Sequence, residues 1–96
     1  MNKKFQQLDA VKILKPVSGT TEVLKDKVLF PVGTIGTVLD IYPDSYLVEI
    51  LWQPTPLTDD GLLVWMKEDE IQPYWRHGDP LPPDSPPPSA FGEKIQ

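Results

Sequence analysis

The fold of this chain is decided by one stretch of its sequence, Gly33-Thr-Ile-Gly-Thr-Val-Leu-Asp-Ile-Tyr-Pro-Asp-Ser-Tyr-Leu-Val-Glu-Ile-Leu-Trp52. Two runs rich in β-branched and aromatic residues flank Pro43-Asp44-Ser45, whose side chains are typical of a tight turn. In the second run the even-numbered positions from Tyr46 to Trp52 share one face of a strand. Gly33 and Gly36 would let the first strand coil without a side-chain clash. The stretch therefore predicts the central hairpin of a small, strongly bent barrel.

Further strands are expected on either side of this hairpin. Residues 8–14 form a first strand that Pro16 ends, with Val11 and Ile13 on one face. The long connection 15–33 follows, in which residues 22–29 fit either a short helix or an irregular hairpin. After the hairpin come a strand at 62–66, a helical turn at 68–71 that places Ile71 in the core, and a closing strand at 72–75. The pattern predicts an all-β fold, a small five-stranded SH3-like barrel.

The composition changes near residue 77. Residues 80–88 contain six of the twelve prolines of the chain, and proline cannot donate a hydrogen bond to a β-ladder. We therefore expect two segments, a domain at 1–77 and a proline-rich, extended or disordered tail at 78–96.

The charge is unevenly distributed. The net charge is −5, yet residues 1–27 carry six lysines against three acidic residues and residues 28–96 carry three basic against eleven acidic residues. A nucleic-acid partner is unfavourable, because the acidic part would repel phosphates. No apolar run approaches the ~20 residues that cross a bilayer, and the first residues lack the apolar segment of a signal peptide. We expect a cytoplasmic protein.

Catalytic groups are scarce. Cysteine is absent and the only histidine is His77, at the edge of the tail, although many reactions need a positioned acid or base. The carboxylates of Asp59-Asp60 and Glu68-Asp69-Glu70 are interpreted as solvated turn charges, because adjacent carboxylates alone do not converge on a metal. The sequence predicts no catalytic residue, no metal, no cofactor and no enzyme activity.

Six tyrosine and tryptophan rings cluster around the predicted third to fifth strands, and a barrel of this size cannot bury them all. Rings left outside could form an interaction patch, or most could be core; Trp52 and Trp75, at strand ends, are expected to be exposed. In the tail, Pro80-Leu-Pro-Pro83 has the spacing that aromatic grooves bind, and Phe91 and Ile95 suggest docking onto the domain or a partner. The candidate partner-binding residues are Tyr42, Trp52, Trp65, Tyr74, Trp75, Pro80, Pro83 and Phe91.

Four segments carry a family resemblance: Asp9-Ala-Val-Lys-Ile13, Val32-Gly-Thr-Ile-Gly-Thr-Val38, Tyr46-Leu-Val-Glu-Ile50 and Glu70-Ile-Gln-Pro-Tyr74. With them the chain resembles a family of small, uncharacterised bacterial SH3-like proteins and, more distantly, the SH3-like domain of the nitrile hydratase beta subunit. The resemblance implies a barrel but no catalytic residue, since the metal site of nitrile hydratase lies in its other subunit, on cysteines that this chain lacks.

Three functions remain open at this point. The first is a non-enzymatic protein-binding module or accessory subunit, monomeric or a small homo-oligomer, that uses the aromatic face, the long first connection and the tail. The second follows from Gly33-x-x-Gly36-x-Val38, which resembles the KOW element of nucleic-acid-associated proteins and would act with the lysines of residues 1–27. The third is a small acidic neutralising protein, like an antitoxin or inhibitor, that caps a partner enzyme.

Overall fold

The computed structural model describes residues 4–52, 55, 57, 59–76, 78, 80 and 93–94. Within these residues the secondary structure consists of strands and one 3-10 turn, which confirms the predicted all-β class. The elements are β1 (Ala10–Ile13), β2 (Val17–Thr20), β3 (Lys27–Phe30), β4 (Ile35–Ile41), β5 (Tyr46–Trp52), β6 (Asp60–Met66), the 3-10 turn η1 (Glu68–Glu70), β7 (Ile71–Trp75) and β8 (Glu93–Lys94).

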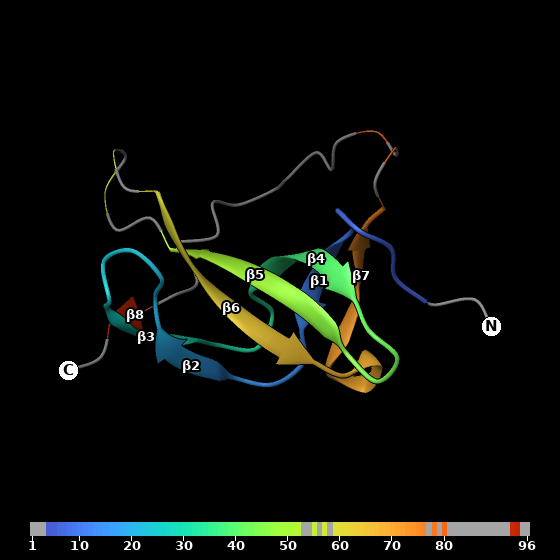
Figure 1. Cartoon of the computed structure of the whole chain (residues 1–96), viewed down its shortest axis with the longest axis horizontal. Coiled ribbons are helices and arrows are strands. Elements are labelled where there is room, and N and C mark those ends of the chain that lie inside the picture. Colours follow the sequence, from blue (N-terminus) through green and yellow to red (C-terminus); the bar gives the residue numbers. More distant parts are fainter. Residues whose placement is uncertain are drawn as a thin grey trace.

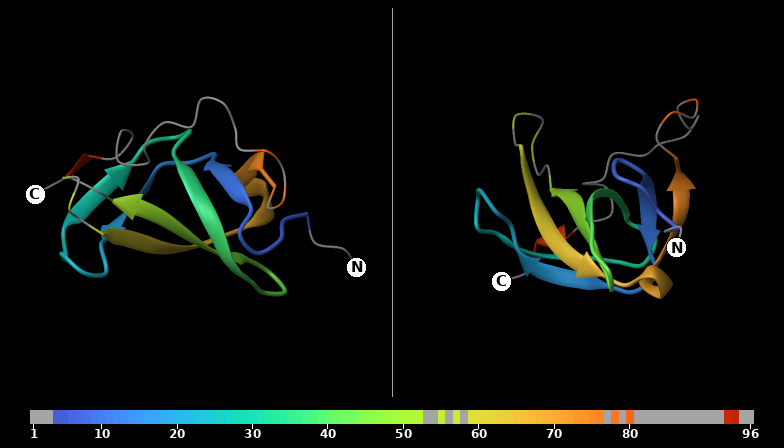
Figure 2. Two further views of the ribbon diagram at one scale, coloured as in Figure 1. Left: turned by 90° about the horizontal axis from the view of Figure 1, so that it is seen from above. Right: turned by 45° about the vertical axis from the view of Figure 1, so that its right-hand side comes forward.

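Five strands form one antiparallel sheet in the order β6-β5-β4-β1-β7 (Figure 1). The predicted closure into a barrel is not found: β6 and β7 stand at opposite ends of this order, and the sheet is curled but open (Figure 2). The start of β6 is next to the connection between β2 and β3, and not next to β7, because Glu22 N donates a hydrogen bond to Gly61 O (2.9 Å). The connection between β2 and β3 therefore meets this end of β6, where closure would have required β7.

The long first connection contains the second sheet, of order β2-β3-β8. Val17 pairs with Phe30 and Thr20 with Lys27 in an antiparallel hairpin, so the choice between helix and hairpin for residues 22–29 is settled as a hairpin. β8 lies against the other edge of β3, with Leu29 opposite Glu93. The predicted domain boundary near residue 77 stays a prediction, because most of residues 77–92 lie outside the described part of the chain.

The core lies on the concave side of the large sheet and extends to the hairpin. β5 alternates between buried and half-buried positions along its whole length, as its sequence predicts. The predicted burial of Ile71 is confirmed, and Val11 and Ile13, predicted to share one face, are both buried. An unpredicted member is Phe5, which precedes β1, is 1% exposed and sets its ring edge-on to Tyr46 with centroids 5.3 Å apart. The other buried apolar residues are Val17, Val28, Phe30, Val38, Val48, Ile50, Trp52, Leu62 and Met66.

The two glycines that open the central hairpin have structural roles, as predicted, but the roles differ. Gly33 takes φ +97° in the turn before β4, a conformation that side chains disfavour. Gly36 lies in close contact with β5. The bend of β4 has another contribution, because the register between β4 and β5 shifts between Val38 and Asp40, and such bulges bend and twist a strand.

We expect Gly36→Ala to lower the free energy of unfolding by about 1–3 kcal/mol, as overpacking in a well-filled core does. A Cβ at this position would lie 2.6 Å from Val48 Cγ1 and 3.1 Å from Glu49 O, and the carbonyl cannot rotate away. Urea denaturation measures the loss. In a Val48→Ala background the same substitution should cost less, because the side-chain clash is gone; equal costs in both backgrounds would contradict this packing.

Candidate binding surface

Three exposed apolar side chains, those of Tyr42, Leu63 and Trp65, lie on the convex side of the large sheet, over β6 and the end of β4. We call Tyr42, Leu47, Leu63 and Trp65 the aromatic surface. Trp65 is 57% exposed, Leu63 38% and Tyr42 37%, while Leu47 is half-buried. The rings of Tyr42 and Trp65 meet edge-on, with centroids 4.6 Å apart and planes at 66°. Two aromatic rings that contact each other while facing water are typical of interaction sites.

The strand register places these residues together. Leu47 lies directly opposite Trp65, and Glu49 opposite Leu63, in the β5–β6 ladder. Because side chains alternate across a strand, the side chains of these two pairs point away from the core, which Val48 helps to fill. The aromatic surface thus lies on the outer face of the β5–β6 pair, and the opposite face of the same pair is buried in the core.

Tyr42 is held in place by the turn after β4. Its backbone N–H donates to Ser45 O (2.9 Å), and its hydroxyl donates to Asp40 Oδ2 (3.1 Å). The hydrogen bond to Asp40 raises the pKa of the Tyr42 hydroxyl above its usual value. The two hydrogen bonds hold the Tyr42 ring beside Trp65.

Trp52 was expected to be exposed, and this prediction is wrong. It is 5% exposed, its Nε1–H donates to Asp26 Oδ2 (3.1 Å), and its ring meets that of Phe30 edge-on at 6.2 Å. Asp26 and Phe30 both belong to the β2–β3 hairpin, which covers this end of β5. Trp52 is therefore a structural residue that fixes the hairpin to the large sheet.

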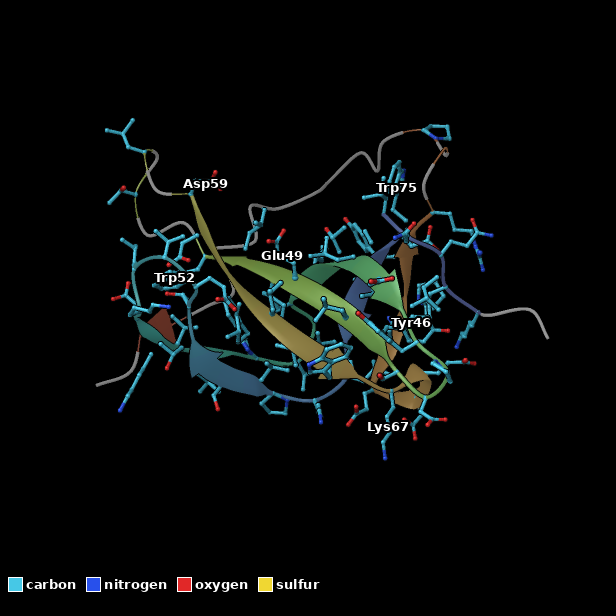
Figure 3. The ribbon with its side chains drawn as sticks, viewed as in Figure 1. Tyr46, Glu49, Trp52, Asp59, Lys67 and Trp75 are labelled. Atoms are coloured by element: carbon cyan, nitrogen blue, oxygen red, sulfur yellow. The ribbon has the colours of Figure 1, made fainter. Side chains whose placement is uncertain are left out.

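Tyr74 and Trp75 lie on β7, at the opposite end of the sheet order from β6. Both are half-buried; Lys12 Nζ lies 5.2 Å from the centroid of the Tyr74 ring, and Trp75 Nε1–H donates to Pro80 O (2.7 Å). Figure 3 shows Trp75 and Trp52 at opposite ends of the molecule. The six rings therefore do not form the single aromatic face that was predicted. Pro83, Phe91, Ile95 and His77 lie outside the described residues.

Asp60 anchors the long first connection. Its carboxylate accepts hydrogen bonds from Val23 N (2.8 Å), Leu24 N (2.9 Å) and Gly61 N (2.8 Å), and the residue is 4% exposed. The interpretation of Asp60 as a solvated turn charge is therefore wrong, whereas Asp59 beside it is exposed. The N–H donors around the buried carboxylate replace the hydrogen bonds with water that the charge loses on burial.

The stability of the protein should depend on the charge of Asp60. Burial raises the pKa of its carboxyl, but the hydrogen bonds from the Thr21 hydroxyl and from the three backbone N–H groups outweigh burial and lower it to about 2, from 3.8. Because the folded pKa is depressed, the stabilisation is complete above about pH 4 and is lost as the pH falls towards 2. We expect the stability advantage of the wild type over Asp60→Asn to shrink by about 2 kcal/mol across this window. Urea denaturation of both proteins at several pH values measures it; a constant difference would contradict this account.

The basic residues of the first third do not gather on one surface in the described part of the chain. Lys12 lies over the ring of Tyr74 on β7, and Lys15 forms an ion pair with Glu70 at η1. Lys25 and Lys27 belong to the β2–β3 hairpin, in the other sheet. The convergence of lysines that a nucleic-acid module would require is therefore not observed among these four.

No model of a protein family matches the chain, and no curated protein or solved structure matches it either. The resemblance to bacterial SH3-like proteins consequently stays a prediction. Within the described residues, no group of three histidine, cysteine, aspartate or glutamate side chains is placed to hold a metal ion. In the same part of the chain, no helix has the length and apolar character that crossing a bilayer requires.

Proposed function

We propose that this chain is a non-enzymatic, SH3-like module that binds another protein through the aromatic surface. The observation that carries the proposal is the contact between two exposed rings, Tyr42 and Trp65, on an ordered antiparallel sheet. Tryptophan and tyrosine are enriched among the residues that contribute most to protein binding, since they bury a large area with few rotatable bonds. Exposed Leu63 extends the apolar area along the same strand.

The SH3-like part of the proposal is supported by the order of the elements. The connection after β1 contains the β2–β3 hairpin, and the three long antiparallel strands β4, β5 and β6 follow. η1 then precedes β7, which returns beside β1. In this arrangement the β2–β3 hairpin is fixed to β5 and β6 by Trp52 and Asp60. We therefore assign the β2–β3 hairpin a structural role, which is to stabilise this end of the large sheet. The partner contact is assigned to the opposite side of β5 and β6.

The two alternative functions receive less support. A nucleic-acid module needs basic groups around the exposed rings, yet β4, β5 and β6 contain no lysine, arginine or histidine. The neutralising function differs from the proposal only in the identity of the partner, an enzyme whose active site is covered. It would use the same aromatic surface.

Site-specific photo-crosslinking tests the proposal. A benzophenone amino acid replaces Leu63 in one variant and Val32 in a control; Val32 is 56% exposed but lies in the turn before β4. After irradiation in the native host, we expect one protein of defined mass to be captured from position 63 and not from position 32. Adding Trp65→Ala should reduce the yield. Equal capture from both positions, no capture, or capture of only a second copy of the chain would contradict the proposal.

A further inference from the structure

The charged side chains of β4, β5 and β6 all have the same sign. Between Lys27 and Lys67 the chain contains no lysine, arginine or histidine, while it contains Asp40, Asp44, Glu49, Asp59 and Asp60. This segment includes all of β4, β5 and β6. Of its carboxylates, Asp60 is buried and occupied by the first connection. The charged groups on the convex side of these three strands are therefore carboxylates alone.

Two of these carboxylates adjoin the aromatic surface directly. Asp40 accepts the hydroxyl hydrogen bond of Tyr42 at 3.1 Å through Oδ2, and it is exposed. Glu49 stands opposite Leu63 in the ladder, on the middle strand of the three (Figure 3). One carboxylate thus lies beside Tyr42 and the other lies opposite Leu63. Lys67, which follows β6, is associated with η1. Its backbone N–H donates to Glu70 Oε1 (2.8 Å), and its charge adds to the hydrogen bond from Lys15 in holding the pKa of the Glu70 carboxyl below its usual value.

Aromatic faces attract cations, most strongly when a carboxylate stands nearby to meet the same charge. The chain already uses this contact elsewhere, with Lys4 Nζ 5.4 Å from the centroid of Phe5 and Lys12 Nζ 5.2 Å from that of Tyr74. Among the described residues, no lysine or arginine lies over the ring of Trp65 or Tyr42. An arginine or lysine from another molecule could therefore lay its alkyl stem on these rings and place its charge between Asp40 and Glu49.

We propose that the occupant of the aromatic surface is a basic segment of the partner protein, whose arginine or lysine side chains stack on Trp65 and Tyr42 and pair with Asp40 and Glu49. This inference rests on the proposed function and adds the chemistry of the partner. Charge complementarity selects this occupant. Acidic segments and nucleic-acid phosphates would be repelled by the same carboxylates.

The test uses two short synthetic peptides with the full chain. One alternates arginine and leucine; the other has uncharged citrulline in place of each arginine. Backbone amide NMR shifts follow each titration. We expect the arginine peptide to shift the amides of residues 40–49 and 61–66 and to bind about fivefold to tenfold more tightly than the citrulline peptide, which is the scale of a few exposed cation–π and ion-pair contacts.

Three variants locate the effect. Trp65→Ala should abolish the localised shifts, and the double substitution Asp40→Asn, Glu49→Gln should bring the two peptides to equal affinity. Asp59→Asn, which removes an exposed carboxylate elsewhere, should change nothing. The inference is overturned if the arginine peptide gives no localised shifts or binds no better than the citrulline peptide. In that event the cross-linking result stands alone: a partner captured from position 63 keeps the proposed function, and only the basic chemistry is withdrawn.

Discussion

Asp60→Ala should lower the free energy of unfolding by about 3–5 kcal/mol. The substitution leaves the N–H groups of Val23, Leu24 and Gly61 without their acceptor, in a place where the side chain itself is 4% exposed. A buried donor that loses its acceptor costs about 1–3 kcal/mol; the hydrogen bond of Gly61 is buried, and those of Val23 and Leu24 are partly buried. A domain of this size is stable by about 5–10 kcal/mol, so the variant should be partly unfolded at 37 °C.

The chain offers a matched control for this experiment. Asp59→Ala removes the same charge one residue earlier, from an exposed side chain, and should change the stability by less than about 0.5 kcal/mol. Urea denaturation with circular dichroism compares the two variants. Equal effects of both would mean that net charge matters and that the hydrogen bonds of Asp60 do not. Asp60→Asn, which keeps the shape and one acceptor oxygen, should lie between them.

Phe5→Ala should destabilise the protein by about 3–4 kcal/mol, as truncation of a buried phenylalanine does. Phe5 is 1% exposed and packs edge-on against Tyr46, which is also 1% exposed. The alanine would leave a cavity between the segment before β1 and the start of β5. A lower melting temperature and stronger binding of an apolar dye are the expected observations.

Two variants separate this packing from a general effect at the chain terminus. Phe5→Leu keeps most of the apolar volume and should recover more than half of the loss, while Gln6→Ala, at an exposed position, should stay within about 0.5 kcal/mol of the wild type. If Phe5→Ala were as stable as Gln6→Ala, the burial of Phe5 would be contradicted.

The large sheet was largely predictable because its signals are local. The bounds of β5 follow from strict alternation between Tyr46 and Trp52, and the turn before it from Pro43-Asp44-Ser45. The helical turn before the last strand was equally recognisable. The β2–β3 hairpin was not, because Ser18-Gly19-Thr20 is a weak strand former and the hairpin is stabilised by contacts outside its own segment.

The errors in the site have one common cause, which is dependence on distant partners. Asp60 looks like a turn residue in Asp-Asp-Gly, yet two of its three backbone N–H donors lie 36 and 37 residues earlier in the chain. Trp52 is buried by the same hairpin, through Asp26 and Phe30. Tyr42 and Trp65 were both among the candidates, but only the folded structure shows that their rings meet each other.

The central claim is that Trp65, and not Trp75, contacts the partner. Its most direct test is calorimetric titration of the protein captured from position 63 with wild type, Trp65→Ala and Trp75→Ala, each first shown to be folded by circular dichroism. The account predicts that Trp65→Ala weakens binding at least about tenfold, as loss of a central tryptophan does, and that Trp75→Ala binds like the wild type. Unchanged binding of Trp65→Ala together with a loss in Trp75→Ala would contradict it.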